Sequence, residues 1–250
     1  MSRIKPSKPN KSATRSAKDR LNELARQRTM SAPCNVVRGK QTVRITGGAF
    51  RSRRLHFPAM PGLRPTPDRV RETLFNWLGQ NLTGLRAVDL FAGSGILGIE
   101  ALSRGAALLF AIEQSPRVAA QIGQNFSLLG VDATRARVWP ADALTWLRQA
   151  PALLAAAPAM DLVFLDPPFA EPKLLNQALV LLNKAAWLAA DARVYVECSA
   201  RGGAIDFPGW VLWREGCAGE SRFMLWRRAD DRAEPCASTG DPCATDGRDG

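Results

Sequence analysis

The sequence predicts an α/β fold built on one mostly parallel sheet that carries helices on both faces. From Arg86 onward, short apolar segments of strand length alternate with segments that have helical spacing. This alternation is typical of βαβ units, which form parallel sheets covered by helices. The first four apolar segments also lead into glycines, acids or prolines, and in such folds ligands bind beyond the carboxyl ends of the strands. The predicted fold therefore contains a candidate site.

Seven strands and four connecting helices follow from this pattern. The strands are expected at Ala87–Phe91, Leu108–Ile112, Ala136–Trp139, Leu162–Leu165, Arg193–Glu197, Trp210–Arg214 and Ser221–Trp226. The helices are expected to begin near Gly95, Pro116, Asp142 and Glu171. The last two strands have only a turn from Glu215 to Glu220 between them, so they should form an antiparallel hairpin at the sheet edge. The alanine-rich segment from Pro151 to Pro158 is expected to be a surface connection.

Two further elements are expected before the sheet. Val43–Thr46 and Ala49–Phe57 should form a β-hairpin, because the Gly47-Gly48 pair between them tolerates the positive φ of a tight turn. Thr66-Pro67-Asp68 predicts a helix start, with a hydroxyl cap, a proline in the first turn and an acid behind it.

Composition divides the chain into one folded domain with a tail at each end. Residues 1–42 and 229–250 lack the apolar content needed to pack, so we expect them to be disordered. The domain then covers residues 43–228, with the hairpin at 43–57. With 46% apolar residues and no apolar run of about 20 residues, we expect a soluble protein outside any membrane. We expect it in the cytoplasm, although the basic, acid-poor residues 1–30 would also suit a transit peptide.

The positive charge of the chain lies almost entirely in its first part. Residues 1–71 hold 18 Lys and Arg against 3 Asp and Glu, whereas the remainder carries a small excess of acids. A segment with this balance favours a polyanionic partner, and the alternative is a solvated tail without a specific partner. The five cysteines have no zinc-ligand spacing, so we expect reduced thiols and no metal.

The first strand of the sheet leads into a glycine turn that could hold a cofactor. Glycines let a ligand approach the backbone, and the free amides of the next helix favour an anionic group. By itself the turn also matches the dinucleotide fingerprint. The residues assigned to cofactor binding here are Asp89, Phe91, Ala92, Gly93, Ser94 and Gly95.

Acids at later strand ends extend this cofactor site. Glu113 follows the second strand, where a carboxylate can accept both ribose hydroxyls, and Asp142 follows the third, where it can receive an adenine amino group. Asp142 could instead only cap the helix that it starts.

The fourth strand runs into the tetrapeptide Asp166, Pro167, Pro168 and Phe169. The two prolines make a stiff turn that presents carbonyl acceptors. The Asp166 carboxylate and the Pro167 carbonyl can accept the two N–H bonds of a planar amine, while Phe169 stacks on its ring. This tetrapeptide is the predicted catalytic site, with Asp166 also beside the cofactor.

Together these motifs resemble the class I methyltransferase fold with its amino-methylating signature. More narrowly, residues 44–51, 62–78 and 91–95 resemble the RsmD family, the guanine-N2 methyltransferases of 16S ribosomal RNA. The resemblance covers about residues 43–228, and its departures, Ser52 and Phe223 among them, lie outside the cofactor and amine motifs. It implies a Rossmann-like sheet, S-adenosyl-L-methionine as cofactor, and transfer of its methyl group to the exocyclic N2 amine of a guanine in 16S rRNA.

The same resemblance implies an RNA-binding surface near the hairpin. The target base must leave its stack to reach the catalytic tetrapeptide, and arginines suit the phosphates around it. Ion pairs with Asp68 or Glu72 could account for some of these arginines instead. The predicted RNA contacts are Arg44, Arg51, Arg53, Arg54, Arg64, Arg69 and Arg71. We expect a monomer that acts on 16S rRNA, bare or within a small-subunit assembly particle.

Other functions explain less of the sequence. An adenine-N6 methyltransferase acting on DNA or RNA is the nearest alternative, but such enzymes more often carry Asn before the proline pair, as do the glutamine methyltransferases of proteins. A dinucleotide oxidoreductase would leave residues 166–169 without a role. A non-catalytic RNA-binding module would leave the whole cofactor site without one.

Overall fold

The computed structural model describes residues 40–155 and 157–229. The tails predicted at 1–42 and 229–250 lie almost wholly outside these residues. Where they overlap, the structure moves one boundary, because strand β1 already begins at Lys40. β1 (Lys40–Arg44) pairs antiparallel with β2 (Arg54–Pro58), which confirms the predicted N-terminal hairpin.

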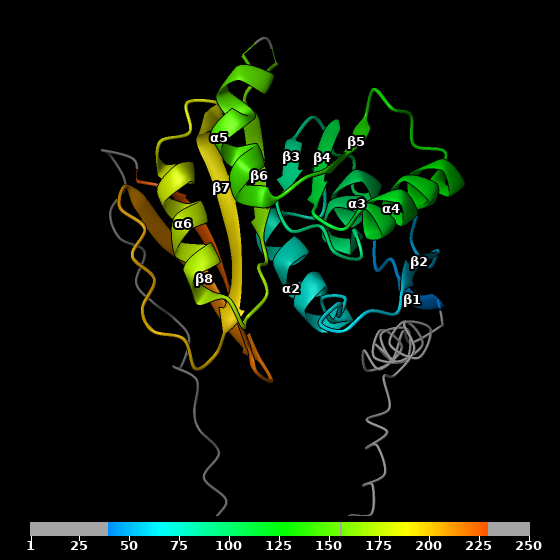
Figure 1. Cartoon of the computed structure of the whole chain (residues 1–250), viewed down its shortest axis with the longest axis horizontal. Helices are drawn as coiled ribbons and strands as arrows, with labels where there is room; N and C mark the ends of the chain where they lie inside the picture. The colour runs from blue at the N-terminus through cyan, green and yellow to red at the C-terminus, as the bar shows by residue number, and fades with distance from the viewer. Residues whose placement is uncertain (1–39, 156, 230–250) are drawn as a thin grey trace, which may run out of the picture. The chain divides into compact units, whose positions relative to one another are not determined.

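A seven-stranded sheet forms the centre of the domain. Its spatial order is β5-β4-β3-β6-β7-β9-β8, with β3 to β7 parallel and β9 antiparallel to both of its neighbours. The strands are β3 (Arg86–Asp89), β4 (Leu108–Glu113), β5 (Ala136–Pro140), β6 (Met160–Leu165), β7 (Leu188–Ser199), β8 (Trp210–Ala218) and β9 (Ser221–Arg228). The mostly parallel sheet with an antiparallel C-terminal hairpin is thus confirmed (Figure 1).

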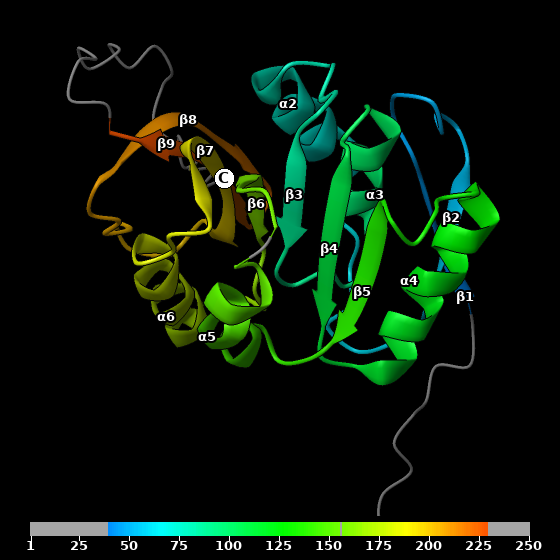
Figure 2. The ribbon, with the colours of Figure 1, turned by 90° about the horizontal axis from the view of Figure 1, so that it is seen from above.

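Helices cover both faces of this sheet because successive strand residues point to opposite sides. In β6, Leu162 and Phe164 pack in one core with the hairpin and with α2 (Asp68–Leu78), α3 (Ile96–Ser103) and α4 (Pro116–Leu129). Val163 and Leu165 pack in a second core with α5 (Ala143–Leu153) and α6 (Pro172–Asn183). Figure 2 shows α5 and α6 together on one face of the sheet and α2 on the other.

The predicted two-residue turn of the hairpin is wrong. Residues 45–53 form a longer loop, in which Ile45 and Ser52 continue the pairing through the Ser52 N to Ile45 O bond of 2.9 Å. The loop packs on the end of α3, where the Ser103 hydroxyl and carbonyl take part in hydrogen bonds with residues 47, 49 and 50. Gly48 is required there, because its φ is +77° and a Cβ would meet the Ser103 carbonyl at 2.0 Å. Contact with α3 therefore decides the shape of this loop.

Three smaller expectations also need correction. Pro67, not Thr66, is the N-cap of α2, and no side chain caps that helix. The last turn of α5 contains Pro151, so the surface connection begins only after Leu153. The turn between β8 and β9 shrinks to Gly219 and Glu220, because β8 continues to Ala218 while β9 begins at Ser221 as predicted.

A buried ion-pair network joins the hairpin to α2 and α3. The Glu100 side chain is fully buried, and its carboxylate pairs with the guanidinium groups of Arg71 and Arg104. It also accepts hydrogen bonds from the amide and the hydroxyl of Thr46. Arg71 in turn donates to the Arg44 carbonyl at 3.0 Å, so three separate segments share one carboxylate. Burial of these charges is tolerated because each has partners.

Removal of the Glu100 charge is therefore expected to be costly. Glu100→Gln should lower the free energy of unfolding by about 3–5 kcal/mol, because two buried guanidinium groups lose their counter-charge. Urea unfolding followed by circular dichroism measures this. The matched control is Glu215→Gln, whose ion pair with Arg222 lies nearer the surface and should contribute no more than about 1 kcal/mol. Equal losses in the two variants would contradict the proposed importance of the network.

Candidate active site

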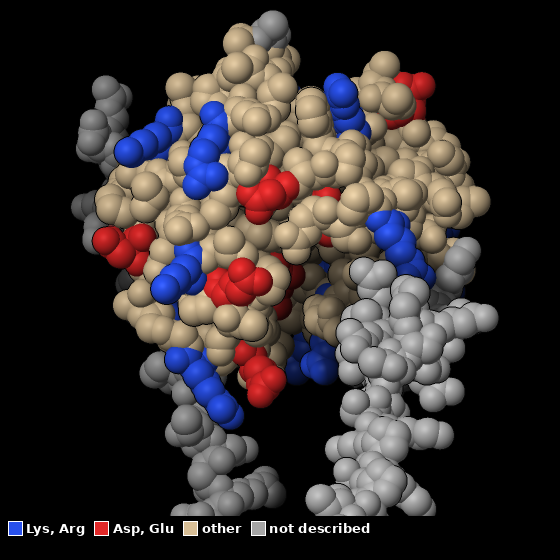
Figure 3. Space-filling model, viewed as in Figure 1, with Lys and Arg blue, Asp and Glu red and all other residues tan. Residues whose placement is uncertain are grey.

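Four carboxylates gather at the carboxyl ends of neighbouring strands. Asp89 ends β3, Glu113 ends β4, Asp166 follows β6, and Glu197 lies near the end of β7. The parallel pairing of β4, β3, β6 and β7 brings these ends to one edge of the sheet. Figure 3 shows exposed acidic side chains near the middle of one face, with basic side chains around them, whereas Asp89 and Glu197 themselves are buried. The parallel topology has thus assembled a strongly acidic site.

The glycine turn lies between β3 and α3 and is tied to the adjacent strand. The Ala92 amide donates to the Ile112 carbonyl at 2.9 Å, and the Gly93 amide donates to the Glu113 carboxylate at 2.9 Å. Gly95 is the N-cap of α3 with φ of 77°, and a Cβ there would press on Ile122 at 3.2 Å. Backbone and glutamate therefore form one rigid cradle at the start of α3.

Glu113 is half-buried in this cradle. Its carboxylate accepts hydrogen bonds from the Gly93 amide and, at 2.7 Å, from the Ser115 amide. Burial raises the pKa of Glu113, and the two amide donors lower it. Each carboxylate oxygen has a further lone pair, so the group can still accept hydrogen bonds from a bound molecule.

Asp89 lies beneath the turn and is nearly fully buried. One carboxylate oxygen accepts the Gly98 amide at 3.2 Å, while the other, Oδ1, is buried without a hydrogen-bond partner. Burial raises the pKa of Asp89 from 3.8 to about 7, and the nearby charge of Glu113 adds to this. An unpaired buried acceptor is costly. A donor or a cation that enters the site would relieve that cost.

The tetrapeptide at the end of β6 lies beside these acids. Asp166 is partly exposed, Pro167 is buried, and Phe169 is 42% exposed at the surface. The Glu171 amide donates to the Pro168 carbonyl at 2.9 Å and closes the turn before α6. Burial, followed by the charges of Glu197 and Asp89, raises the pKa of Asp166 well above its usual range, while a hydrogen bond with the Thr66 side chain lowers it. The structure therefore brings Asp166 together with Asp89 and Glu113.

Two residues of the site were not predicted. Glu197 is a buried acid at a strand end, and the sequence signal used for Glu113 applies to it equally, since it ends the predicted strand Arg193–Glu197. Thr66 was interpreted as a helix cap, but its side chain contacts Asp166 instead. No local sequence signal predicts this contact, because it depends on how the segment before α2 packs against the end of β6.

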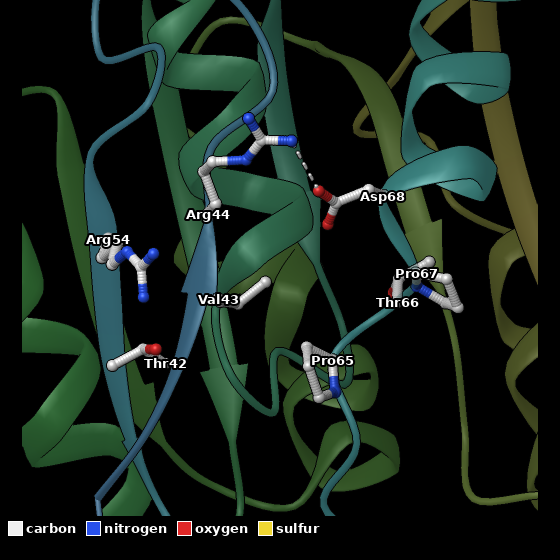
Figure 4. A pocket seen from close by; sticks show the side chains of 8 residues that line it. All are labelled: Thr42, Val43, Arg44, Arg54, Pro65, Thr66, Pro67 and Asp68. Carbon is white, nitrogen blue, oxygen red and sulfur yellow. Dashed lines mark hydrogen bonds and ion pairs between the residues drawn. The ribbon is translucent and has the colours of Figure 1, made fainter.

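A cleft opens on the hairpin side of Thr66. It has a volume of about 330 Å³ and lies between the hairpin strands and the segment before α2. At one end the Arg44 guanidinium points toward the Asp68 carboxylate, 3.2 Å away, while Arg54 extends from β2 (Figure 4). Its lining residues are Thr42, Val43, Arg44, Arg54, Pro65, Thr66, Pro67 and Asp68. We refer to it as the hairpin cleft.

Comparison with known proteins gives a consistent family. A family model described as "Conserved hypothetical protein 95" matches residues 43–227. Ribosomal RNA small subunit methyltransferase D of Escherichia coli strain K12 is 42% identical over 191 residues, which are 76% of this chain and 92% of that relative. Its counterpart in Haemophilus influenzae is 39% identical over 188 residues, 75% of this chain and 95% of the relative. The chain belongs to the RsmD family.

A solved structure agrees with this RsmD assignment. The yhhF protein of Escherichia coli is 39% identical, covers 75% of this chain and 98% of its own, and superposes with a TM-score of 0.65. The Rossmann-like methyltransferase fold expected for an RsmD chain is thereby confirmed. No helix in the described part of the chain is both long enough and apolar enough to cross a membrane.

The assignment of Arg71 to RNA binding in this RsmD chain is wrong. Arg71 is fully buried and binds Glu100 and Asp68, so it cannot reach a phosphate. Its position one helical turn into α2 had suggested a surface residue, but its guanidinium points into the core. The other six are exposed at the surface and remain candidates: Arg44, Arg51, Arg53, Arg54, Arg64 and Arg69.

Asp142 caps helix α5, which was the alternative to a role in cofactor binding. It is the N-cap of α5, and its Oδ1 accepts the Thr145 amide at 2.8 Å. The residue is exposed, and its second carboxylate oxygen can still receive a hydrogen bond.

The raised pKa of Asp89 predicts how stability depends on pH. Between pH of about 4 and 7 the folded protein retains a proton that the unfolded chain releases, so stability should fall as the pH rises through this range. Asp89→Asn removes the ionisation and should raise the free energy of unfolding at pH 8 by about 1–3 kcal/mol, with little effect at pH 4. Urea unfolding at both pH values tests this, with the exposed Asp206→Asn as control. A gain of equal size at pH 4 would contradict the ionisation argument.

Proposed function

We propose that this chain transfers a methyl group from S-adenosylmethionine to the exocyclic N2 amine of a guanine in small-subunit ribosomal RNA. The observation that supports this most directly is the acidic site at the strand ends, in which a glycine cradle and the Asp166 turn lie side by side in a member of the RsmD family. We further propose a monomer that acts in the cytoplasm, with 16S rRNA as its partner, bare or within an assembly particle.

The residues present fit the proposed cofactor. S-adenosylmethionine carries an ammonium and a sulfonium group, and the site offers the unpartnered Oδ1 of buried Asp89 as an acceptor for a cationic donor. Gly93 and Gly95 have the positive φ that the turn before α3 requires, and we assign Phe91, Ala92 and Ser94 to the same cradle. Glu113 would accept the ribose hydroxyls, and the second oxygen of Asp142 the adenine amine. When bound, the cofactor supplies an electrophilic methyl group.

The chain itself contributes position and charge to this reaction. Asp166 and the Pro167 carbonyl would accept the two N–H bonds of the amine and so aim its lone pair. Phe169, exposed beside them, would stack on the ring. Because no covalent nucleophile is needed, most of the rate would come from holding two reactants in line. Pro167 and Pro168 keep the turn stiff, so that the acceptors are fixed before the substrate arrives.

The exposed arginines of the N-terminal part would hold the RNA. Arg44 and Arg54 line the hairpin cleft, and Thr66 connects this cleft to Asp166, so RNA bound there would lie next to the reacting amine. Arg51 and Arg53 lie exposed in the hairpin loop, where the Arg53 guanidinium also donates to the Leu128 carbonyl of α4. Phosphate contacts of this kind position RNA without reading its sequence.

Asp166 and Glu113 are expected to have separable effects. Asp166→Ala should lower turnover by orders of magnitude while cofactor affinity stays within a few-fold, because Asp166 acts on the amine. Glu113→Ala should instead weaken cofactor binding by about 1–3 kcal/mol, the range for loss of a charged acceptor. Calorimetric titration beside a single-turnover assay separates the two. If Asp166→Ala abolishes cofactor binding while turnover per bound cofactor survives, the assignment of Asp166 to the amine is wrong.

RNA binding is expected to depend on the hairpin arginines and not on the cofactor site. Replacing Arg51, Arg53 and Arg54 by Ala should weaken RNA binding and flatten its salt dependence, by about 0.7–0.9 in log–log slope for each phosphate that the variant no longer binds. Filter binding over a salt series measures the slope. A triple variant of exposed arginines elsewhere, Arg148, Arg201 and Arg214, serves as the matched control. Equal salt slopes for the two triple variants would show that the hairpin arginines do not contact RNA phosphates.

The proposed function as a whole is tested by mapping methylated nucleotides. Ribosomal RNA from cells with and without the gene should differ at one N2-methylated guanine of the small-subunit RNA, and purified protein with S-adenosylmethionine should restore it. A methylated adenine, or no difference in rRNA, would refute the proposal.

A further inference from the structure

Glu197 is a buried acid that the proposed mechanism does not yet use. It is 4% exposed, and hydroxyl groups donate to both of its oxygens. The Tyr195 hydroxyl donates to Oε2 at 2.8 Å, and the Ser221 hydroxyl of β9 donates to Oε1 at 2.5 Å. Two hydroxyl donors stabilise the ionised form of a buried carboxylate, and so partly replace the water that burial excludes.

The sheet places this carboxylate directly beside Asp166. Leu165, the last residue of β6, pairs with Val196 of β7, so Asp166 and Glu197 each directly follow a member of this pair. The two acids are close enough that the charge of Glu197 acts on Asp166. Leu165 and Val196 both pack in the core under α5 and α6. Because side chains alternate along a strand, Glu197 lies on the same face as Tyr195, which packs in the core that contains α2. The Thr66 side chain, just before α2, makes a hydrogen bond with Asp166, so Asp166 lies on this side as well.

We propose that Glu197 is a positioning residue of the methyl transfer, whose buried negative charge makes Asp166 a stronger acceptor for the hydrogens and the proton of the amine. This inference rests on the proposed function. Glu197 needs no contact with the substrate, which agrees with its burial. It acts on Asp166 through the charge interaction of the two acids, which the burial of Glu197 strengthens.

The groups around Asp166 and Glu197 determine which of these two acids carries a proton when the pair holds only one. Asp89 of β3, Glu197, Tyr195 and Cys198 of β7, and the Thr66 side chain before α2 all act on Asp166 or on its neighbour. Glu197 receives two hydroxyl donors whereas Asp166 receives the one from Thr66, so the negative charge is better stabilised on Glu197. Burial raises the pKa of both acids, and that of Asp166 well above its usual range. When the pair holds a single proton, Asp166 therefore carries it and Glu197 keeps the negative charge.

This arrangement has a defined place in the reaction. When bound, the cofactor would supply the methyl group and its sulfur would keep the electron pair of the carbon–sulfur bond, while the amine nitrogen would form the new bond to carbon. The methylated nitrogen then loses one proton, which ionised Asp166 takes and later passes to solvent. A neighbouring negative charge strengthens this proton acceptor, and it also means that Asp166 is protonated, and the enzyme inactive, at a higher pH than a lone carboxylate would allow.

The test is the pH dependence of the single-turnover rate at saturating cofactor, with the full-length protein and an RNA that contains the mapped guanine. Glu197→Gln should move the acidic limb of the profile to lower pH by about one unit, because the charge beside Asp166 is gone. Its plateau rate should fall about tenfold, because Asp166 is then the weaker proton acceptor. Glu220→Gln, an identical change at an exposed acid between β8 and β9, should leave limb and plateau unchanged.

A second variant covers the case in which Glu197→Gln does not fold. Ser221→Ala removes one donor to Glu197, so it should move the limb in the same direction by a smaller amount. A rate that falls at all pH values with an unmoved limb, in either folded variant, would show a structural role only and overturn the inference. If wild-type protein methylates no guanine at all, the proposed function fails instead, so the two failures are distinguishable.

Discussion

The Glu100 carboxylate is the contact on which the active-site side of the domain depends. It lies inside the core between α2, α3 and the hairpin, and it holds Arg71 by an ion pair. Arg71 also donates to the Thr66 carbonyl at 2.9 Å, and the Thr66 side chain reaches Asp166. A charge buried far from solvent thus fixes the backbone of the segment that forms one wall of the site. The same arginine binds the Arg44 carbonyl and so sets the hairpin beside that wall.

At the strand ends, by contrast, buried acids lie beside one another and not beside basic partners. There Asp89, Asp166 and Glu197 lie close together, and burial raises the pKa of each. Such a cluster of acids lowers the stability of the protein at neutral pH. A ligand that brings positive charge to the site offsets this cost. The same cluster of acids therefore lowers the stability of the free protein and favours the binding of a cationic cofactor.

Much of the fold followed from local patterns because the strands and helices have strong periodicity. The four helix starts predicted near Gly95, Pro116, Asp142 and Glu171 lie within one residue of the observed ones, since each is marked by a glycine, proline or capping residue. Turns were predicted less well. The hairpin loop takes its shape from Ser103, more than 50 residues further along the chain, and no local signal contains that contact.

The sequence by itself determined which chemical groups are present and at which strand ends they lie, because strand and turn signals are local and parallel strands share one edge. It therefore predicted the glycine cradle, Glu113 and the Asp166 turn, and the family that they indicate. Tertiary structure alone decided which charged residues are buried. Arg71 and Arg69 belong to the same motif, yet one is in the core and the other in solvent, because only Arg71 faces Glu100 across the packing of α2 on α3. Likewise Glu197 gained its place beside Asp166 from the register of β6 and β7, a relation between segments that no single stretch of sequence contains.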